Sequence, residues 1–321
     1  MGAEGGEVRS VRKFALLFAL VAVAWAGAFL SAQLFRSSIV CPGDSMAMRV
    51  ASGGSSPYVT LTADGRRGNF LLDWGSTTSS LSAAAFPDGA PTSRRVAFDL
   101  PSFAQGQFQS AQYPAIAGLS GEQLGLVGTD FLSQMSATLS YDAGGGHVRL
   151  SAQPCDAGRL TERGYVPVDQ TGYFSARPAG ERANVPVLFV ALGSVTVAAQ
   201  IDSGYEDRLW RHSIDINETL HRRLVEAGIR LEPAGATSVA TCTGSEKRSE
   251  LRVPGLPLAI QDDKGRIIRR ITDYHLIPKA PNACGGIADT KEPAAQLGAS
   301  FLRTLSPVVI DGKAGRVWIR E

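Results

Sequence analysis

Two aspartates occupy matching positions in two similar stretches of the chain. Asp73 lies in the segment FLLDWGS (residues 70–76), and Asp202 lies in AQIDSGY (residues 199–205). A carboxylate directly after an apolar strand is a costly place for a charge unless a site uses it. Two such carboxylates could share one proton, because like charges about 3 Å apart cannot both ionise. One would then act as base and the other as acid on a water that attacks a carbonyl group, which requires no metal or cofactor.

The similarity extends beyond the aspartates. Residues 58–72 and 185–201 each read as two short strands joined by a glycine-containing turn, so each aspartate is expected at the end of a hairpin. Downstream, Gly128 and Gly298 each begin a Gly-x-x-Phe-Leu segment that leads into a further strand. A duplicated half with one aspartate in each copy can bring two carboxylates together on a pseudo-twofold axis.

Composition favours a mainly β protein of two lobes. The chain has 321 residues with 44% hydrophobic content, 35 Gly and 17 Pro, which suits many short strands joined by turns. One helix is expected, since residues 215–218 resemble a capping box and Gly228 would end the helix. The formal net charge is +2 without a long block of one sign, so we expect no nucleic-acid partner.

The amino terminus predicts export. Arg9, Arg12 and Lys13 precede an uncharged run over residues 14–35, which is long enough for a bilayer span of about 20 residues. The positive flank would stay cytoplasmic, so the remainder would be periplasmic or extracellular. A cleaved signal peptide is the alternative, because residues 26–28 are small. The expected divisions are a cytoplasmic tail (1–13), a membrane anchor (14–35), a linker (36–50), an N-terminal lobe (51–155), an interlobe connection (156–181) and a C-terminal lobe (182–321).

The four cysteines fit an exported protein. An even number of cysteines in an oxidising compartment predicts disulfides. The boundaries of the repeat favour Cys41 with Cys155 and Cys242 with Cys284. Four free buried thiols are the alternative. No second Cys or His stands at metal-ligand spacing, so no metal site is expected.

The paired motifs resemble the pepsin and retropepsin superfamily of aspartic peptidases, as two fused retropepsin-sized lobes of bacterial type. The family's mark is Asp-Thr/Ser-Gly with a downstream apolar-apolar-Gly in each lobe, and the resemblance covers about residues 56–321. It implies a bilobal acid-protease-like fold of two pseudo-symmetric β-barrel lobes. It also implies a catalytic dyad of Asp73 and Asp202, with segments 126–128 and 296–298 crossing behind the two loops.

The resemblance implies supporting residues as well. Gly75 and Gly204 would shape the two loops, and Ser76 would hydrogen-bond the carboxylate of Asp73. The residue after each aspartate is normally a hydroxyl that braces the loops against each other. Ser203 keeps that hydroxyl, whereas Trp74 does not, because an indole supplies one donor and no acceptor.

The implied activity is that of an aspartic endopeptidase acting on extended peptides or envelope proteins, without a cofactor. Trp74, Tyr205 and Tyr113 are the expected substrate-binding residues, and the flap aromatic of the first lobe would be Phe103, Phe108 or Tyr113. The alternative is an inactive peptide-binding or scaffolding domain of the cell envelope. Trp74 and Tyr205 favour that alternative, since both depart from the family's pattern.

Overall fold

The computed structural model describes residues 40–87, 94–96, 106–113, 115–116, 118–168, 185–205, 212–241, 244–280 and 286–321. Residues 41–321 form one compact unit, separate from residues 1–40. The expected membrane anchor at residues 14–35 lies outside the described residues. Within the described ranges, no helix has the length and apolar character needed to cross a bilayer.

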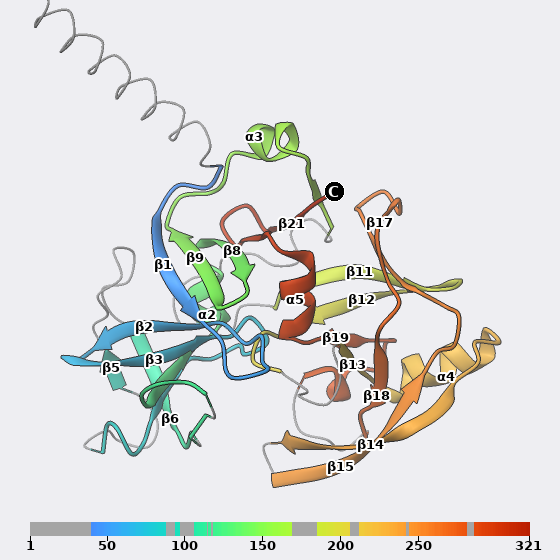
Figure 1. Ribbon diagram of the computed structural model, residues 1–321, viewed down its shortest axis with the longest axis horizontal. Helices are drawn as coiled ribbons and strands as arrows, with labels where there is room; N and C mark the ends of the chain where they lie inside the picture. Colours follow the sequence, from blue (N-terminus) through green and yellow to red (C-terminus); the bar gives the residue numbers. More distant parts are fainter. Residues whose placement is uncertain are drawn as a thin grey trace, which may run out of the picture. The chain divides into compact units, whose positions relative to one another are not determined.

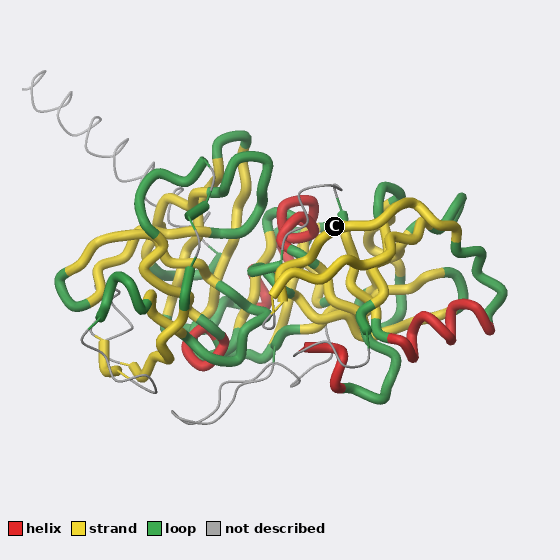
Figure 2. Tube along the Cα trace, turned by 90° about the horizontal axis from the view of Figure 1, so that it is seen from below, coloured by secondary structure: helices red, strands yellow, loops and turns green. Residues whose placement is uncertain are grey.

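Strands are the main secondary structure of the described chain, as expected, and the helices are short (Figure 2). The strands form a twelve-stranded and a nine-stranded sheet (Figure 1). The first sheet runs in the order β10 (Tyr165–Pro167), β21 (Arg316–Arg320), β20 (Val308–Asp311), β8 (Ser136–Asp142), β9 (Gly145–Ser151), β1 (Asp44–Arg49), β2 (Tyr58–Ala63), β3 (Arg66–Leu72), β7 (Gln123–Val127), β4 (Ser80–Ser82), β6 (Gly106–Ala111) and β5 (Arg94–Val96).

The second sheet runs in the order β14 (Glu232–Thr241), β15 (Gly244–Arg252), β18 (His275–Pro278), β13 (Ser213–Ile216), β19 (Ala295–Leu297), β12 (Val195–Ile201), β11 (Val187–Leu192), β16 (Leu258–Gln261) and β17 (Ile267–Ile271). The helices are α2 (Thr129–Leu132), α3 (Ala157–Glu162), α4 (Glu218–Glu226) and α5 (Ala299–Leu305), with a 3₁₀ turn η1 (Gly286–Asp289).

The repeat in the sequence is a repeat of the fold. In the first half (β2 to β9), the hairpin β2–β3 places β3 parallel to β7, β4 pairs antiparallel with β7, and β6 lies parallel to β4. In the second half (β11 to β21), β11–β12, β19, β13 and β18 make the same pairings in the same order. A short helix and a two-stranded unit then follow in each half: α2 with β8–β9, and α5 with β20–β21.

The two halves meet in the first sheet. Strand β20 pairs antiparallel with β8, its counterpart in the repeat, so the carboxyl-terminal strands lie beside strands of the first half (Figure 1). Strand β10, from the expected interlobe connection, pairs with β21 at the edge. The first sheet therefore contains strands from the beginning, the middle and the end of the unit.

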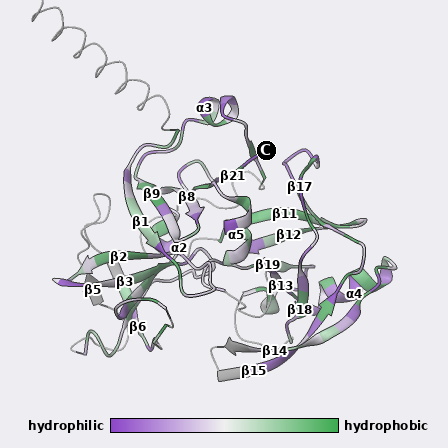
Figure 3. Ribbon diagram, in the orientation of Figure 1, coloured by the Kyte–Doolittle hydropathy of each residue, from purple (hydrophilic) through white to green (hydrophobic). Residues whose placement is uncertain are grey.

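The core follows the two-residue period of strands. In β12, Val195, Val197, Ala199 and Ile201 are buried while the residues between them are more exposed, as expected for a strand with one face inward. Strand β11 lies between β12 and β16. It is buried on both faces, and it is accordingly hydrophobic along most of its length (Figure 3). This packing fixes the strands that end at the aspartates.

The expected helix is present but begins later than its sequence pattern indicates. Helix α4 starts at Glu218, with Asn217 as its N-cap accepting a hydrogen bond from the Leu220 main-chain N–H at 2.9 Å. The predicted capping box from Asp215 is wrong, because Asp215 belongs to β13 and its backbone pairs with β18. Its carboxylate is therefore buried in a sheet, with consequences for the site.

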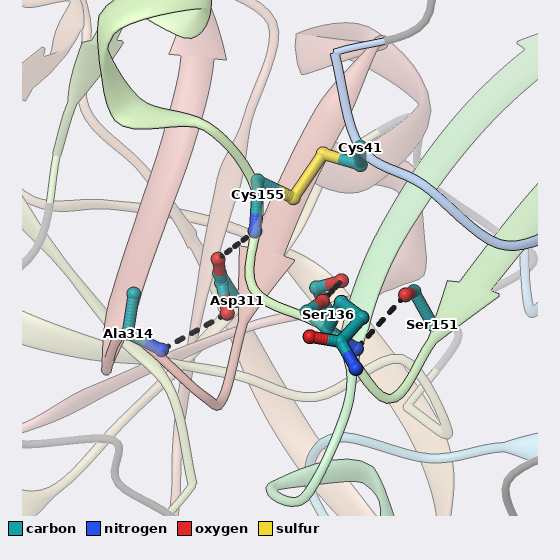
Figure 4. Close-up of a disulfide and its surroundings, with 7 residues drawn as sticks. Cys41, Ser136, Ser151, Cys155, Asp311 and Ala314 are labelled. Atoms are coloured by element: carbon teal, nitrogen blue, oxygen red, sulfur yellow. Dashed lines mark hydrogen bonds between the residues drawn. A yellow bond between two sulfur atoms is a disulfide. The ribbon is translucent and has the colours of Figure 1, made fainter.

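The predicted disulfide between Cys41 and Cys155 is confirmed, with a Cα–Cα distance of 4.4 Å (Figure 4). The main-chain N–H of Cys155 donates to Oδ2 of Asp311 at 2.7 Å, which connects the bridge to the end of β20. The second predicted pair, Cys242 and Cys284, lies outside the described residues.

Removing the described bridge should destabilise the unit. The bridge closes a separation of 114 residues, and constraining such a loop in the unfolded chain contributes about 2–4 kcal/mol. We expect the Cys41→Ser/Cys155→Ser double variant to lose about that much free energy of unfolding in urea titrations. The control is Ser45→Ala/Ser140→Ala, which changes exposed serines of β1 and β8. An unfolding midpoint equal to the control's would contradict the prediction.

Candidate active site

The hairpins β2–β3 and β11–β12 present Asp73 and Asp202 in the same way. The main-chain N–H of Asp73 donates to the carbonyl of Val127, and that of Asp202 donates to the carbonyl of Leu297, each at 2.9 Å. Each aspartate is thus held at the end of its strand by the segment that crosses behind it.

Only glycine fits at the position after each crossing strand. A Cβ atom on Gly128 would lie 2.8 Å from the carbonyl oxygens of Ser76 and Thr78. A Cβ atom on Gly298 would lie 2.8 Å from the carbonyl oxygen of Tyr205. Real Cβ atoms do not approach backbone so closely, so the apolar-apolar-Gly spacing reflects the packing of these strands against the aspartate loops.

The two aspartate loops also touch each other. A Cβ atom on Gly75 would lie 2.2 Å from Cγ of Asp202, and one on Gly204 would lie 2.3 Å from Oδ2 of Asp73. Each loop glycine therefore lies directly against the carboxyl group of the opposite half. Any larger residue at either position would push the two carboxyl groups apart.

Asp73 and Asp202 are brought into direct contact. Their carboxyl groups hydrogen-bond to each other, and the N–H of Gly204 donates to Oδ1 of both, at 3.1 Å to Asp73 and 2.9 Å to Asp202. Oδ1 of Asp73 also accepts from Gly75 N–H at 2.8 Å, and Oδ1 of Asp202 accepts from Tyr205 N–H at 2.9 Å. The Oδ1 atoms thus face the axis between the halves.

Burial makes the two carboxyl groups unequal. Burial raises the pKa of Asp73, and main-chain N–H donors, Gly75 first among them, act against this rise. Burial and then the charge of Asp73 raise the pKa of Asp202 well above its usual value. The two carboxyl groups therefore titrate as one pair, because the first ionisation leaves a single proton between them and its charge opposes the second ionisation. This is the arrangement of one base and one acid.

One hydroxyl braces the loops across the axis. Oγ of Ser203 donates to the carbonyl of Leu72 at 2.8 Å and accepts from the main-chain N–H of Trp74 at 2.9 Å. The second half therefore holds the loop of the first half. The reciprocal bond is missing, because Trp74 has no hydroxyl.

Trp74 does not have the substrate-binding role expected for it. Its side chain is fully buried and belongs to the hydrophobic core, so it offers no surface to a substrate. Its Nε1–H has no hydrogen-bond partner among the described residues. A buried donor without a partner costs about 1–3 kcal/mol, which packing of the large ring must offset.

The expected bond between the Ser76 hydroxyl and Asp73 is also absent. The hydroxyl of Ser76 donates to the carbonyl of Thr78 at 2.8 Å, within its own loop. The main-chain N–H of Ser76, rather than its hydroxyl, bonds the carboxylate of Asp73. Ser76 thus stabilises the loop and the charge of Asp73 through its backbone.

Tyr113 is the first-half aromatic near the dyad. Its half-buried hydroxyl hydrogen-bonds Ser80, and burial together with the charge of Asp73 raises the pKa of Tyr113 to about 12. Phe108 is instead a core residue that stacks on Phe131 at a centroid distance of 5.2 Å. The third flap candidate, Phe103, lies outside the described residues. Tyr113 therefore remains the candidate to contact a substrate.

A buried polar cluster behind Asp202 was missed in the sequence. The amide Nε2 of Gln296 donates to Oδ2 of Asp202 at 2.6 Å. Asp215 and Arg248 form an ion pair at 3.1 Å with both side chains 3% exposed, and the buried Lys279 also acts on Asp215. A polar residue in the apolar position of the crossing segment was the available signal for Gln296.

The described part of the chain contains no group of three or more His, Cys, Asp or Glu that could hold a metal ion.

No protein-family model matches the chain, and no curated protein matches it. Among solved structures, it is similar to an aspartic proteinase from Irpex lacteus, with 13% identity, a TM-score of 0.46, and coverage of 87% of this chain and 97% of that one. It is also similar to conglutin gamma, a basic 7S globulin from lupine seeds, with 10% identity, a TM-score of 0.48, and coverage of 87% and 95%. These two likenesses carry no conclusion about the function of the protein, which is inferred from the geometry of the site.

Loss of the interlobe brace should destabilise the protein. Ser203→Ala would leave the buried carbonyl of Leu72 and the N–H of Trp74 without their partner, so we expect a loss of about 2–4 kcal/mol in urea unfolding. Ser76→Ala is the matched control, because it removes a hydroxyl that bonds only within its own loop, and it should cost less than about 1 kcal/mol. Equal losses in the two variants would show that the brace adds no stability.

We expect the ring of Trp74, rather than its N–H group, to stabilise the protein. Trp74→Phe keeps most of the ring and removes the unpaired donor, whereas Trp74→Thr leaves a cavity that costs about 3–5 kcal/mol. We expect Trp74→Phe to retain nearly all of the free energy of unfolding. Trp318→Phe, at another buried tryptophan, relieves no such donor and should cost more than Trp74→Phe. The reverse order of these two losses would rule this explanation out.

Proposed function

We propose that the protein is an aspartic endopeptidase that hydrolyses peptide bonds through Asp73 and Asp202. The observation that carries the proposal is the contact between two carboxyl groups from the two copies of a repeat, which share the N–H of Gly204. Asp73 is buried and Asp202 is half-buried. The pKa values of both are raised and their titrations are coupled, so the pair can hold one proton, with one carboxyl group as base and the other as acid.

In the proposed reaction, ionised Asp73 takes a proton from a water whose oxygen attacks the carbonyl carbon of the peptide bond. Asp202 donates its proton to the carbonyl oxygen, which gives a neutral tetrahedral intermediate. The leaving nitrogen then takes the proton from Asp73, the C–N bond breaks, and the new carboxyl group returns a proton to Asp202. Both aspartates end in their starting states.

The proposed substrates are extended peptides or proteins of the cell envelope. In this proposal the domain is exported and held at the membrane through residues 14–35. The disulfide between Cys41 and Cys155 supports an oxidising compartment, because such bridges persist there. Tyr113 and Tyr205 are the proposed substrate contacts, since both are half-buried and close to the dyad.

A non-catalytic peptide-binding domain is the second candidate. The observation that favours it is the one-sided brace, since Ser203 holds the loop of Asp73 while Trp74 returns no side-chain bond. In this case the paired carboxyl groups would remain, but the alignment needed to activate water would be lost.

The test compares the full-length protein with Asp73→Asn and Asp202→Asn on a diverse peptide library. Asn keeps the shape of the side chain but cannot act as base, so each variant should lose cleavage by at least about 100-fold. Asp64→Asn, in the exposed turn between β2 and β3, is the control and should retain activity. Cleavage that survives both dyad substitutions would contradict the peptidase proposal.

Activity of the wild type should have a bell-shaped dependence on pH. It should rise as Asp73 ionises, at a pH above the ordinary carboxyl value of 3.8, and fall as Asp202 loses its proton at higher pH. If the wild type cleaves nothing between about pH 3 and pH 7 yet binds the same peptides in fluorescence anisotropy, the binding domain is the correct assignment.

A further inference from the structure

We propose that Gln296 is a positioning residue of the dyad, which holds Asp202 from the side remote from Asp73 through its hydrogen bond to Oδ2. This inference rests on the proposed function, because it explains how the two carboxyl groups of the proposed acid–base pair are kept aligned.

The two oxygens of Asp202 have different surroundings. Oδ1 accepts the N–H groups of Gly204 and Tyr205, both at 2.9 Å, on the side that faces Asp73. Oδ2 accepts the amide of Gln296 at 2.6 Å. Donors on both oxygens fix the plane of the carboxyl group.

The strand β19 places Gln296 for this bond. Gln296 pairs with Gln200 of β12, two residues before Asp202, and with Asp215 of β13 on its other side. In the first half the corresponding residue of the crossing strand is Leu126, which has no donor to offer. Within the described residues, Asp73 receives only main-chain N–H groups and the carboxyl group of Asp202. The donor is therefore a feature of one half only.

The oxygen of the amide lies in the neighbourhood of a cation. Oε1 of Gln296 and the ammonium Nζ of Lys279 both lie beside Gly286, where an added Cβ atom would be 3.0 Å from Oε1 and 3.3 Å from Nζ. An amide with its oxygen near a cation and its nitrogen on a carboxylate has the orientation that the surrounding charges favour. The side chain is 6% exposed, so water competes little for these bonds.

The charges facing this site are the carboxyl groups of Asp73, Asp202 and Asp215 together with Lys279 and Arg248. Burial raises the pKa of Asp215 to about 6, and the charges of Arg248 and Lys279 act against this rise. The hydroxyls of Tyr205 and Tyr113 approach Asp215 and Ser80 respectively. Among these groups, Gln296 is the side-chain donor on Asp202 that keeps its form at all relevant pH values.

The test uses the full-length protein labelled with ¹³C at the aspartate carboxyl carbons and follows the dyad by NMR titration. The Asp73 and Asp202 signals are assigned by their loss in the two Asn variants. Gln296→Met keeps the length of the side chain and removes the donor that stabilises ionised Asp202. We expect the upper apparent pKa of the pair to rise by about one pH unit, and the falling limb of the activity profile to move with it.

The control is Gln261→Met, the same change at a half-buried glutamine of β16, which should leave the dyad titration unchanged. Gln296→Glu is the second variant, for use where Gln296→Met does not fold. It offers no amide donor and adds a negative charge, so the upper apparent pKa should again rise. A dyad titration in the Gln296 variants equal to that of the wild type would overturn the inference, even with activity intact.

The two proposals fail in different ways. A wild type that cleaves nothing while its dyad titrates as a coupled pair would contradict the peptidase function, and the same titration would still decide the role of Gln296. A purely structural role for Gln296 would lower the unfolding midpoint without moving the dyad titration, and this outcome counts against the inference.

Discussion

The structure depends on the close approach of two loops that each carry a carboxyl group. Gly75 lies against Asp202 and Gly204 lies against Asp73, with no room for a single added carbon. Two acids at this distance repel each other once both are ionised, so the fold must supply donors and a rigid frame. The main-chain N–H groups of the loops, the Ser203 brace and the shared sheet through β8 and β20 provide them.

The two halves repeat each other in topology but not in chemistry. Strands β3, β7 and β4 have the same pairings as β12, β19 and β13, and the aspartates make the same main-chain bonds at 2.9 Å. Around the aspartates the halves differ, because only the second carries the bracing hydroxyl and the amide donor to its carboxyl group. The main-chain frame of the aspartates is therefore common to both halves, while the side-chain donors around it come from the second half.

The buried cluster behind Asp202 shows how charge can be kept inside a sheet. Asp215 is a strand residue whose ion pair with Arg248 has almost no exposed surface, and such a pair stabilises only when further donors satisfy it. Lys279 supplies another positive charge nearby. The cluster and the dyad are thus parts of one buried polar region, which Gln296 connects.

The sequence by itself determined the duplicated plan, the pairing of Asp73 with Asp202 and the bridge between Cys41 and Cys155, because a repeat is visible as a pattern and its boundaries indicate which residues meet. Only the tertiary structure decided what the polar side chains contact. Trp74 was expected at a substrate and is buried in the core, Asp215 was expected at a helix cap and lies in a sheet, and Gln296 was taken as part of a crossing segment. Such roles depend on residues distant in sequence, whose approach is set by packing of whole sheets rather than by local pattern.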